Sequence, residues 1–444
     1  MRTRHLGIIV ASLVPACSEP PPSISTPFPP APIERLTFPA APRRELDLLF
    51  VIDNAGSVWE AQAAVASSLG GLLATLERGL GTRADLHIGV VSTDMGTLGV
   101  TFGACSPPGR PAGDDGALLR NGCAGIDGTF LRDVARPDGT RDVNYVGELT
   151  ERFGCMARLG TAGCAVEAPL GALDRALAPG RNPGFVRAGS TLAVVLVTNE
   201  DDCTFTDPAF LDPANTALGP LGRFRCFEAG VRCEPDQPRR FGTHVGCHAR
   251  EDSPYLPSVA GFVERLRARR PEPGRLVAAA IHGSVDAART AEVVPDDPDA
   301  ARPALAPSCS GQTGWGLPAF RLADFIDALG GTTGTVCDAD QTATMTALGA
   351  RIGATLGVPC FANAVRDADP AVPGVQAQCT VGEATVATGD FHLVPACDEG
   401  LGGACWRVVE DAARCPLGAH HYLAVDRPTP APAGATLTAT CTIE

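Results

Sequence analysis

Runs of consecutive apolar residues constrain the fold of this chain more than any other feature. Residues 48–52 are all apolar in "DLLFVIDNAGSV", and "STLAVVLVT" at 190–198 and "RLVAAAIHG" at 275–283 have the same character. A strand without a polar face must be buried on both sides, which is typical of a parallel sheet covered by helices. The stretch 58–80, in which apolar residues recur at helical spacing, predicts one of these helices.

The alternation of strand and helix patterns continues to about residue 356. A second strand is expected at 85–93, and further helices are expected at 166–178, 257–270, 318–329 and 341–356. Two cysteine-bearing loop regions interrupt the pattern, at 97–144, with one edge strand near 129–134, and at 203–254. This alternation predicts the α/β class, with a doubly wound, mostly parallel sheet and helices on both faces.

The texture of the sequence changes after residue 357. Residues 358–444 contain six cysteines, little helical periodicity and short strand-like runs such as "HHYLAVD" and "GATLTATCTI". Disulfides stabilise domains that are too small to bury a large core. We therefore expect a small disulfide-rich β domain at 358–444, after a main domain at 45–357.

The first 44 residues predict an export signal followed by a spacer. Arg2 and Arg4 precede an apolar run at 6–14 that is too short to span a bilayer, and the run ends in "LVPAC". This ending resembles a bacterial lipoprotein signal, which implies that residues 1–17 are the signal and that Cys17 carries the lipid. Ordinary cleavage, with Cys17 as a spare thiol, is the alternative. Residues 18–44 are rich in proline and predict a disordered, extended linker.

The remaining cysteines also indicate export. Setting Cys17 aside, ten lie between Cys105 and Cys337 and six between Cys360 and Cys441. Both counts are even, so we expect each region to close its own disulfides in an oxidising compartment, with no bridge between the regions. No cysteine spacing typical of a zinc site occurs.

Composition disfavours several classes of function. The net charge of −14 disfavours nucleic acid and anionic lipid as partners. The 36 basic residues are all arginine, and a chain without lysine lacks P-loop phosphate binding, Schiff-base catalysis and Ser–Lys dyads. The GxSxG motif of serine hydrolases is absent, and Ala55 stands where haloacid-dehalogenase-type phosphotransferases need a second aspartate. We therefore expect no enzyme activity.

Oxygen-bearing side chains gather where the predicted strands end. Asp53 and Ser57 follow the first strand, Asp94 follows the second, and "TNEDD" at 198–202 follows the strand at 190–198. In a doubly wound sheet, ligands bind at the carboxyl ends of the strands. Oxygen ligands from several loops suit a hard cation, so Mg²⁺ or Ca²⁺ is the expected ion.

Four segments in this order, "DLLFVIDNAGSV", "HIGVVSTD", "LGTAG" and "LAVVLVTNEDD", resemble the von Willebrand factor A-like domain. The resemblance covers residues 45–356 and extends to the cysteine-bearing, lipid-anchored bacterial forms of that domain. It implies a metal-ion-dependent adhesion site, written Asp-x-Ser-x-Ser, then Thr, then Asp. In that family the metal leaves one coordination position open for a carboxylate of a partner protein.

Matched residue by residue, the implied site is degenerate. Ala55 stands where the family has its first Ser, and Asn199 where it has its closing Asp, so one hydroxyl and one charge are lost. A neighbouring acid, Asp94 or Asp201, could restore the charge. The candidate ligands are Asp53, Ser57, Asp94, Thr161, Asn199 and Asp201.

The leading interpretation is a binding or adhesion-type module that recognises a protein partner, aided by a weak divalent-metal site. It would be exported and anchored through the lipid on Cys17 in the bacterial cell envelope, at the outer membrane, with no other membrane contact. An inert structural envelope protein is the first alternative. A metal-dependent hydrolase is the second.

Overall fold

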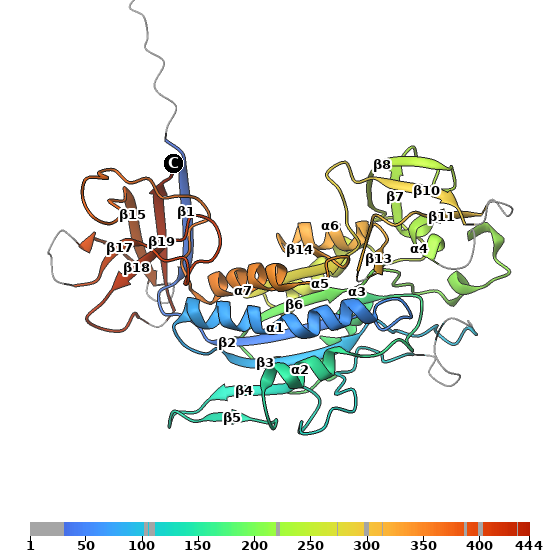
Figure 1. Cartoon of the computed structure of the whole chain (residues 1–444), viewed down its shortest axis with the longest axis horizontal. Coiled ribbons are helices and arrows are strands. Elements are labelled where there is room, and N and C mark those ends of the chain that lie inside the picture. The colour runs from blue at the N-terminus through green and yellow to red at the C-terminus, as the bar shows by residue number, and fades with distance from the viewer. Residues whose placement is uncertain are drawn as a thin grey trace, which may run out of the picture.

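The computed structural model describes residues 31–444 except 102–104, 106–111, 219–222, 273, 297–301, 313, 386–388, 398–402 and 433. Its largest sheet has seven strands in the order β14-β9-β6-β2-β3-β4-β5 (Figure 1). The strands from β14 to β3 are parallel, and β4 and β5 are antiparallel. Their bounds are Glu45–Ile52 (β2), Asp85–Ser92 (β3), Leu131–Ala135 (β4), Arg141–Val143 (β5), Thr191–Val197 (β6), Leu276–His282 (β9) and Thr332–Thr335 (β14).

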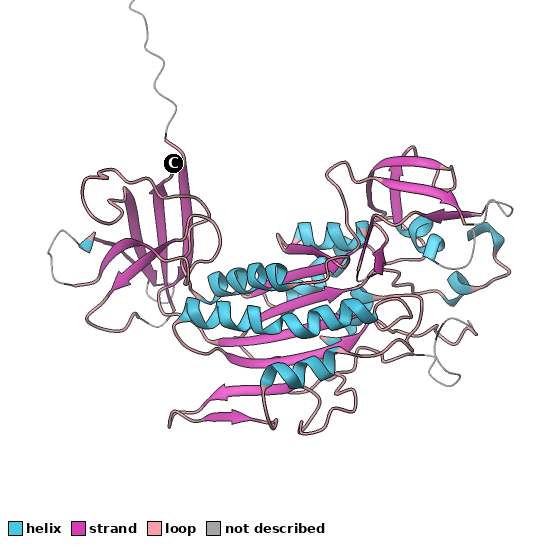
Figure 2. Ribbon diagram, viewed as in Figure 1, coloured by secondary structure: helices cyan, strands magenta, loops and turns pink. Residues whose placement is uncertain are grey.

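Helices cover both faces of this sheet (Figure 2). One face packs against Trp59–Leu80 (α1), Leu149–Ala157 (α2) and Thr342–Leu356 (α7). The other packs against Pro169–Ala176 (α3), Val259–Arg269 (α5) and Phe320–Ala328 (α6). The central strands β2 and β6 send alternate side chains into each core, which is why residues 48–52 and 192–197 are all apolar. The predicted fold class is confirmed.

The second cysteine-bearing region is more structured than its sequence indicated. A helix, Arg223–Gly230 (α4), leads into a four-stranded sheet in the order β11-β10-β8-β7. Its strands are Val231–Glu234 (β7), Gly242–Ala249 (β8), Ala291–Pro295 (β10) and Pro303–Leu305 (β11). Smaller elements nearby are the 3-10 turns Pro208–Leu211 and Thr216–Leu218 and the hairpin Cys309–Gly311 (β12) with Gly314–Gly316 (β13). Because β10 and β11 follow β9, this subdomain combines segments that are distant in the sequence.

The last part of the chain forms a β structure, as expected. Four strands lie in the order β1-β19-β15-β16, and β17 pairs with β18. Their bounds are Ile33–Pro39 (β1), Cys379–Thr385 (β15), Asp390–Val394 (β16), Cys405–Glu410 (β17), His421–Asp426 (β18) and Ala435–Thr442 (β19).

The expectation of a disordered linker at 18–44 is wrong for residues 33–39. These residues form β1, which pairs along its whole length with β19 (Figure 1). Phe38 is buried in the core of the C-terminal domain, and the Glu34 carboxylate accepts hydrogen bonds from the backbone of Ala362 and Asn363. The high proline content predicted no strand here, and the strand with which β1 pairs lies some four hundred residues later in the sequence. Residues 1–30, with the expected signal and Cys17, lie outside the described residues.

Eight disulfides join all sixteen cysteines beyond Cys17. Five lie between 105 and 337, and three lie between 360 and 441, so the expected division into two groups is confirmed. The pairs are Cys105–Cys164, Cys123–Cys155, Cys203–Cys226, Cys233–Cys247, Cys309–Cys337, Cys360–Cys415, Cys379–Cys441 and Cys397–Cys405. Among the described residues, no helix is both long and apolar enough to cross a bilayer.

Candidate functional site

The candidate site lies where the strand order of the large sheet reverses. The chain runs from β2 to β3 on one side, and β6 then returns to the other side of β2. Ile52 is level with Ser92 of β3 and with Val197 of β6, so the residues that follow these strands emerge side by side. Asp53, Thr93 and Thr198 are those residues, and all three are buried. This is the usual ligand-binding position of a doubly wound sheet.

One loop, residues 160–168, is hydrogen-bonded to all three strand ends. The Gly163 N–H donates to the Asn54 carbonyl, the Ala168 N–H donates to the Thr93 carbonyl, and the Cys203 N–H donates to the Glu167 carbonyl. The amide of Gln62, in α1, also donates to the carbonyls of Asp53 and Gly160. Segments that are distant in the sequence are therefore held together at the carboxyl edge of the sheet.

Asp53 is buried and hydrogen-bonded through both carboxylate oxygens. Its Oδ1 accepts from the Ala55 N–H at 2.8 Å, and its Oδ2 accepts from the Thr198 hydroxyl at 2.9 Å. Burial raises the pKa of Asp53 to about 6, although these hydrogen bonds and the backbone of Asn199 act in the opposite direction. A cation at this place would remove the electrostatic cost of burying the charge.

Ser57 and Asn199, both matched to the metal site of the resembled family, lie side by side at this edge. The Asn199 amide donates to the Ser57 hydroxyl at 2.9 Å. The other polar atom of this side chain, Oδ1, is buried and has no hydrogen-bond partner. Thr161 follows Gly160, whose backbone is held by Gln62, and its own side chain is exposed.

The two acids that could restore the lost charge have other contacts. The Oδ1 of Asp94 accepts from the Gly96 N–H at 2.9 Å. Both oxygens of Asp201 accept from backbone N–H groups at the start of α6, those of Arg321 and Leu322. Asp201 thus satisfies donors that a helix cannot satisfy itself. Burial still raises its pKa to about 7.

A buried acidic group beside Asp53 was missed by the sequence reasoning. Glu167 and Glu200 are both almost fully buried, and Glu200 forms an ion pair with Arg223 at the start of α4. Burial, with a smaller contribution from the charge of Asp53, raises the pKa of Glu200 to about 7, although Arg223 acts in the opposite direction. Burial and the neighbouring Glu200 and Asp53 raise the pKa of Glu167 well above its usual range. The available signal was the run of acids after β6; nothing in the sequence indicated that Glu167 would join it.

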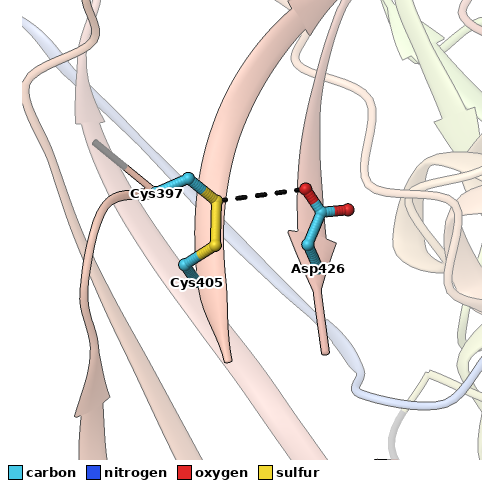
Figure 3. A group of neighbouring side chains, drawn as sticks. All are labelled: Cys397, Cys405 and Asp426. Atoms are coloured by element: carbon cyan, nitrogen blue, oxygen red, sulfur yellow. Dashed lines mark hydrogen bonds between the residues drawn. A yellow bond between two sulfur atoms is a disulfide. The ribbon is translucent and has the colours of Figure 1, made fainter. Parts of the chain in front are cut away.

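The oxygen donors around Asp53 fit a hard cation in kind but are not a complete cage. The buried, unpartnered Oδ1 of Asn199 is an acceptor that an ion could use. Within the described part of the chain, however, only one group of three His, Cys, Asp or Glu residues has ligand atoms within 4.8 Å of one another, and it lies elsewhere. That group is Cys397, Cys405 and Asp426 (Figure 3). Its sulfur atoms are consumed in a disulfide, so it offers no thiolate ligand.

The described histidines show no catalytic pairing with a nucleophile. His282, at the end of β9, bonds through Nδ1 to the Gly283 carbonyl, and its Nε2 is buried without a partner. Burial lowers its pKa, so the ring is neutral. The other ring-nitrogen contacts, of His87, His244, His248, His420 and His421, are to backbone groups or to Asp324, and Nδ1 of His87 also lies 3.8 Å from Oδ1 of Asp47. No described histidine ring bonds to a Ser, Thr or Cys side chain.

No protein-family model and no curated protein matches this sequence. Among solved structures, the chain is similar to a von Willebrand factor type A protein from Catenulispora acidiphila, with 13% identity, a TM-score of 0.28, and coverage of 93% of this chain and 66% of the other. It is also similar to the pilus adhesin SpaC of Lactobacillus rhamnosus GG in its open conformation, with 11% identity, a TM-score of 0.34, and coverage of 95% and 42%. The pilus adhesin RrgA of Streptococcus pneumoniae gives 10% identity, a TM-score of 0.29, and coverage of 93% and 58%. The chain thus spans between about two fifths and two thirds of these proteins, and likenesses at these TM-scores carry no functional argument.

Proposed function

We propose that this chain is an exported, lipid-anchored binding module that recognises a protein partner at the carboxyl edge of its large sheet. The convergence of Asp53, Ser57 and Asn199 at that edge carries the proposal, because it presents oxygen ligands at the usual ligand position of this fold. The chain carries eight disulfides, which are typical of proteins outside the cytosol.

The position of the site relative to β1 supports this function. β1, the first described strand, belongs to the C-terminal domain, and this domain lies at one end of the α/β domain (Figure 1). That end is tied to α1 near its last turn, where Arg78 donates to the Ala413 carbonyl. The start of α1, with half-exposed Trp59, lies at the opposite, carboxyl edge beside Asp53. The candidate site and β1, through which the chain would be tethered, therefore lie at opposite ends of the α/β domain.

The proposal assigns a supporting role to Mg²⁺ or Ca²⁺. Asp53, Ser57 and Asn199 would hold the ion, and the ion would supply a positive charge that a carboxylate of the partner could bind. Because Ala55 and Asn199 remove a hydroxyl and a charge, we expect weak affinity. Thr161, whose side chain is exposed on the adjoining loop, is the further candidate ligand.

Thermal unfolding tests the metal. Mg²⁺ or Ca²⁺ at millimolar concentration should raise the melting temperature of the wild-type chain slightly, since a ligand that binds only the folded state stabilises it. Asp53→Ala should abolish the rise, and Ala55→Ser should enlarge it by adding a hydroxyl. Glu60→Gln, an exposed change in the first turn of α1, is the matched control. If Ala55→Ser and the wild type are both indifferent to metal, recognition uses no ion here.

Capture from envelope extract tests the partner. Immobilised wild-type chain should retain a protein that Asp53→Ala and a chelator both release, and that Glu60→Gln retains. If the retained proteins are the same for wild type and Asp53→Ala, with or without chelator, the candidate edge does not bind a partner. The chain would then be the inert structural protein of the alternative interpretation.

A further inference from the structure

The strongest unassigned feature is a small cavity beneath α4, beside the Asp53 edge but separate from it. Glu167, Glu200 and Arg223 line it, together with the Cys203–Cys226 disulfide. Its volume is about 20 Å³, which is room for about one water molecule or ion. Glu167 comes from the loop before α3, Glu200 from the end of β6, and Arg223 from the first residue of α4.

The charges around this cavity do not balance within the protein. Three carboxyl groups, those of Asp53, Glu167 and Glu200, are almost fully buried, Asp201 also lines the cavity, and the ion pair with Arg223 supplies one positive charge. When the four acids and Arg223 are all ionised, these groups carry a net charge of −3. Buried charges are expensive unless they are paired, so such a cluster must take up protons or a cation. One divalent ion would offset two of these three charges.

Glu167 also has an acceptor that the protein leaves unused. Its residue is 2% exposed, it lines the cavity, and its Oε1 has no hydrogen-bond partner. Glu167 and Glu200 both line the cavity, and the charge of Glu200 raises the pKa of Glu167, so the two carboxyl groups are neighbours. Two carboxylates that face a cavity large enough for one ion are the ligands that hard divalent cations prefer.

We propose that Glu167 and Glu200 bind a hard divalent cation, of the Ca²⁺ or Mg²⁺ class, in the cavity beneath α4. Asp53 contributes its charge from outside the coordination sphere, because the ligand atoms of the three acids do not all lie within 4.8 Å. In the absence of the ion, Arg223 is the counter-charge. This site goes beyond the one in the proposed function, as it uses neither Ser57 nor Asn199.

Arg223 provides a spectroscopic reporter for the site. Its guanidinium lies 4.9 Å from the centre of the Trp315 ring while it pairs with Glu200. An ion that takes the place of Arg223 at Glu200 repels the guanidinium and changes its contact with the indole. The intrinsic fluorescence of Trp315 should therefore change as the ion binds, and Trp315→Phe should remove the change.

Equilibrium dialysis of the full chain at pH 7.5 with Ca²⁺ and with Mg²⁺, alongside fluorescence titration, tests the proposal. Besides any weak ion at the Asp53 edge, we expect one ion whose dissociation constant rises at least tenfold in Glu167→Gln and in Glu200→Gln, but not in Ser57→Ala or in the surface control Glu60→Gln. Arg223→Gln should tighten binding about tenfold, because it removes a like charge next to the ion. Near-ultraviolet circular dichroism shows whether Glu167→Gln and Glu200→Gln still fold. If they do not, Arg223→Gln tests the site alone, because Arg223 is half exposed and its replacement leaves the buried core unchanged.

The remaining outcomes overturn the inference. If the wild-type chain binds neither ion at about 10 mM, the highest concentration of the titration, it has no such site. Binding that Ser57→Ala abolishes and Glu167→Gln preserves belongs to the Asp53 edge, which would support the proposed function while refuting this one. Binding that Arg223→Gln weakens or leaves unchanged would show that the ion lies away from this cavity.

Discussion

The ion pair between Asp202 and Arg321 should contribute more to stability than any surface pair in this chain. Both side chains are 0% exposed, and the Oδ2 of Asp202 accepts from Nε and Nη2 of Arg321 at 3.3 and 3.1 Å. The Oδ1 accepts from the Leu170 N–H in the first turn of α3 and from the Thr204 hydroxyl. Asp202→Ala would therefore leave a buried guanidinium without its counter-ion and remove a helix-capping acceptor.

We expect Asp202→Ala to lower the free energy of unfolding by about 3–5 kcal/mol, the range for removing one partner of a buried ion pair. Replacing both partners, in Asp202→Leu with Arg321→Met, should cost much less, because no uncompensated charge remains. Urea denaturation followed by circular dichroism measures both. Arg407→Ala breaks a half-exposed pair with Asp426 at 3.0 Å and is the control, with an expected cost of about 0–1 kcal/mol. If Asp202→Ala costs no more than Arg407→Ala, the reasoning about the buried pair is refuted.

Three further predictions follow from the same structure. In metal-free buffer, the melting temperature should fall as the pH rises from about 4.5 through 7, because burial raises the pKa of Glu200 to about 7 and the folded state therefore keeps this proton to a higher pH than the unfolded state does. Glu200→Gln should flatten the dependence of the melting temperature on pH. An unchanged dependence in this variant would contradict the assignment. A chain that begins after residue 40 should lose at least about 2 kcal/mol of stability in its C-terminal domain, because β1 and the buried Phe38 are removed. The prediction is wrong if this chain resists protease as well as a chain that begins at residue 31. Mass spectrometry of the mature protein should find a diacylated Cys17 at the N-terminus, and a free amine at Ser18 or beyond would exclude the anchor.

The architecture of the main domain could be predicted because it depends on local patterns. Each of β2, β6 and β9 contains an apolar run without a polar face, and a strand of this kind is stable only when helices cover both faces of its sheet. The two even cysteine counts likewise limited the disulfides to two separate sets before any pairing was known. Asp53, Ser57 and Asn199 could be expected to lie together because parallel strands end at one edge.

Contacts between distant segments could not be read from the chain. Nothing near Ile33–Pro39 indicates that it pairs with Ala435–Thr442, because strand pairing depends on a partner that only the folded chain brings alongside. The short strands β7, β8, β10 and β11 form one sheet from segments that lie before and after β9 in the sequence, and a disulfide joins β7 to β8.

The local sequence determined that acids would lie at the carboxyl edge, and the tertiary structure decided what each acid does. Asp201 and Asp202 look equivalent to Glu200 in "TNEDD", yet Asp201 accepts hydrogen bonds from the start of α6, Asp202 pairs with Arg321, and Glu200 pairs with Arg223 beside the cavity that Asp201 also lines. The role of Glu167 arises only because its loop is hydrogen-bonded to the ends of β3 and β6. A carboxylate's charge, burial and partners are properties of three-dimensional neighbours, and for this reason the sequence predicted the edge but not the acidic cavity beside it.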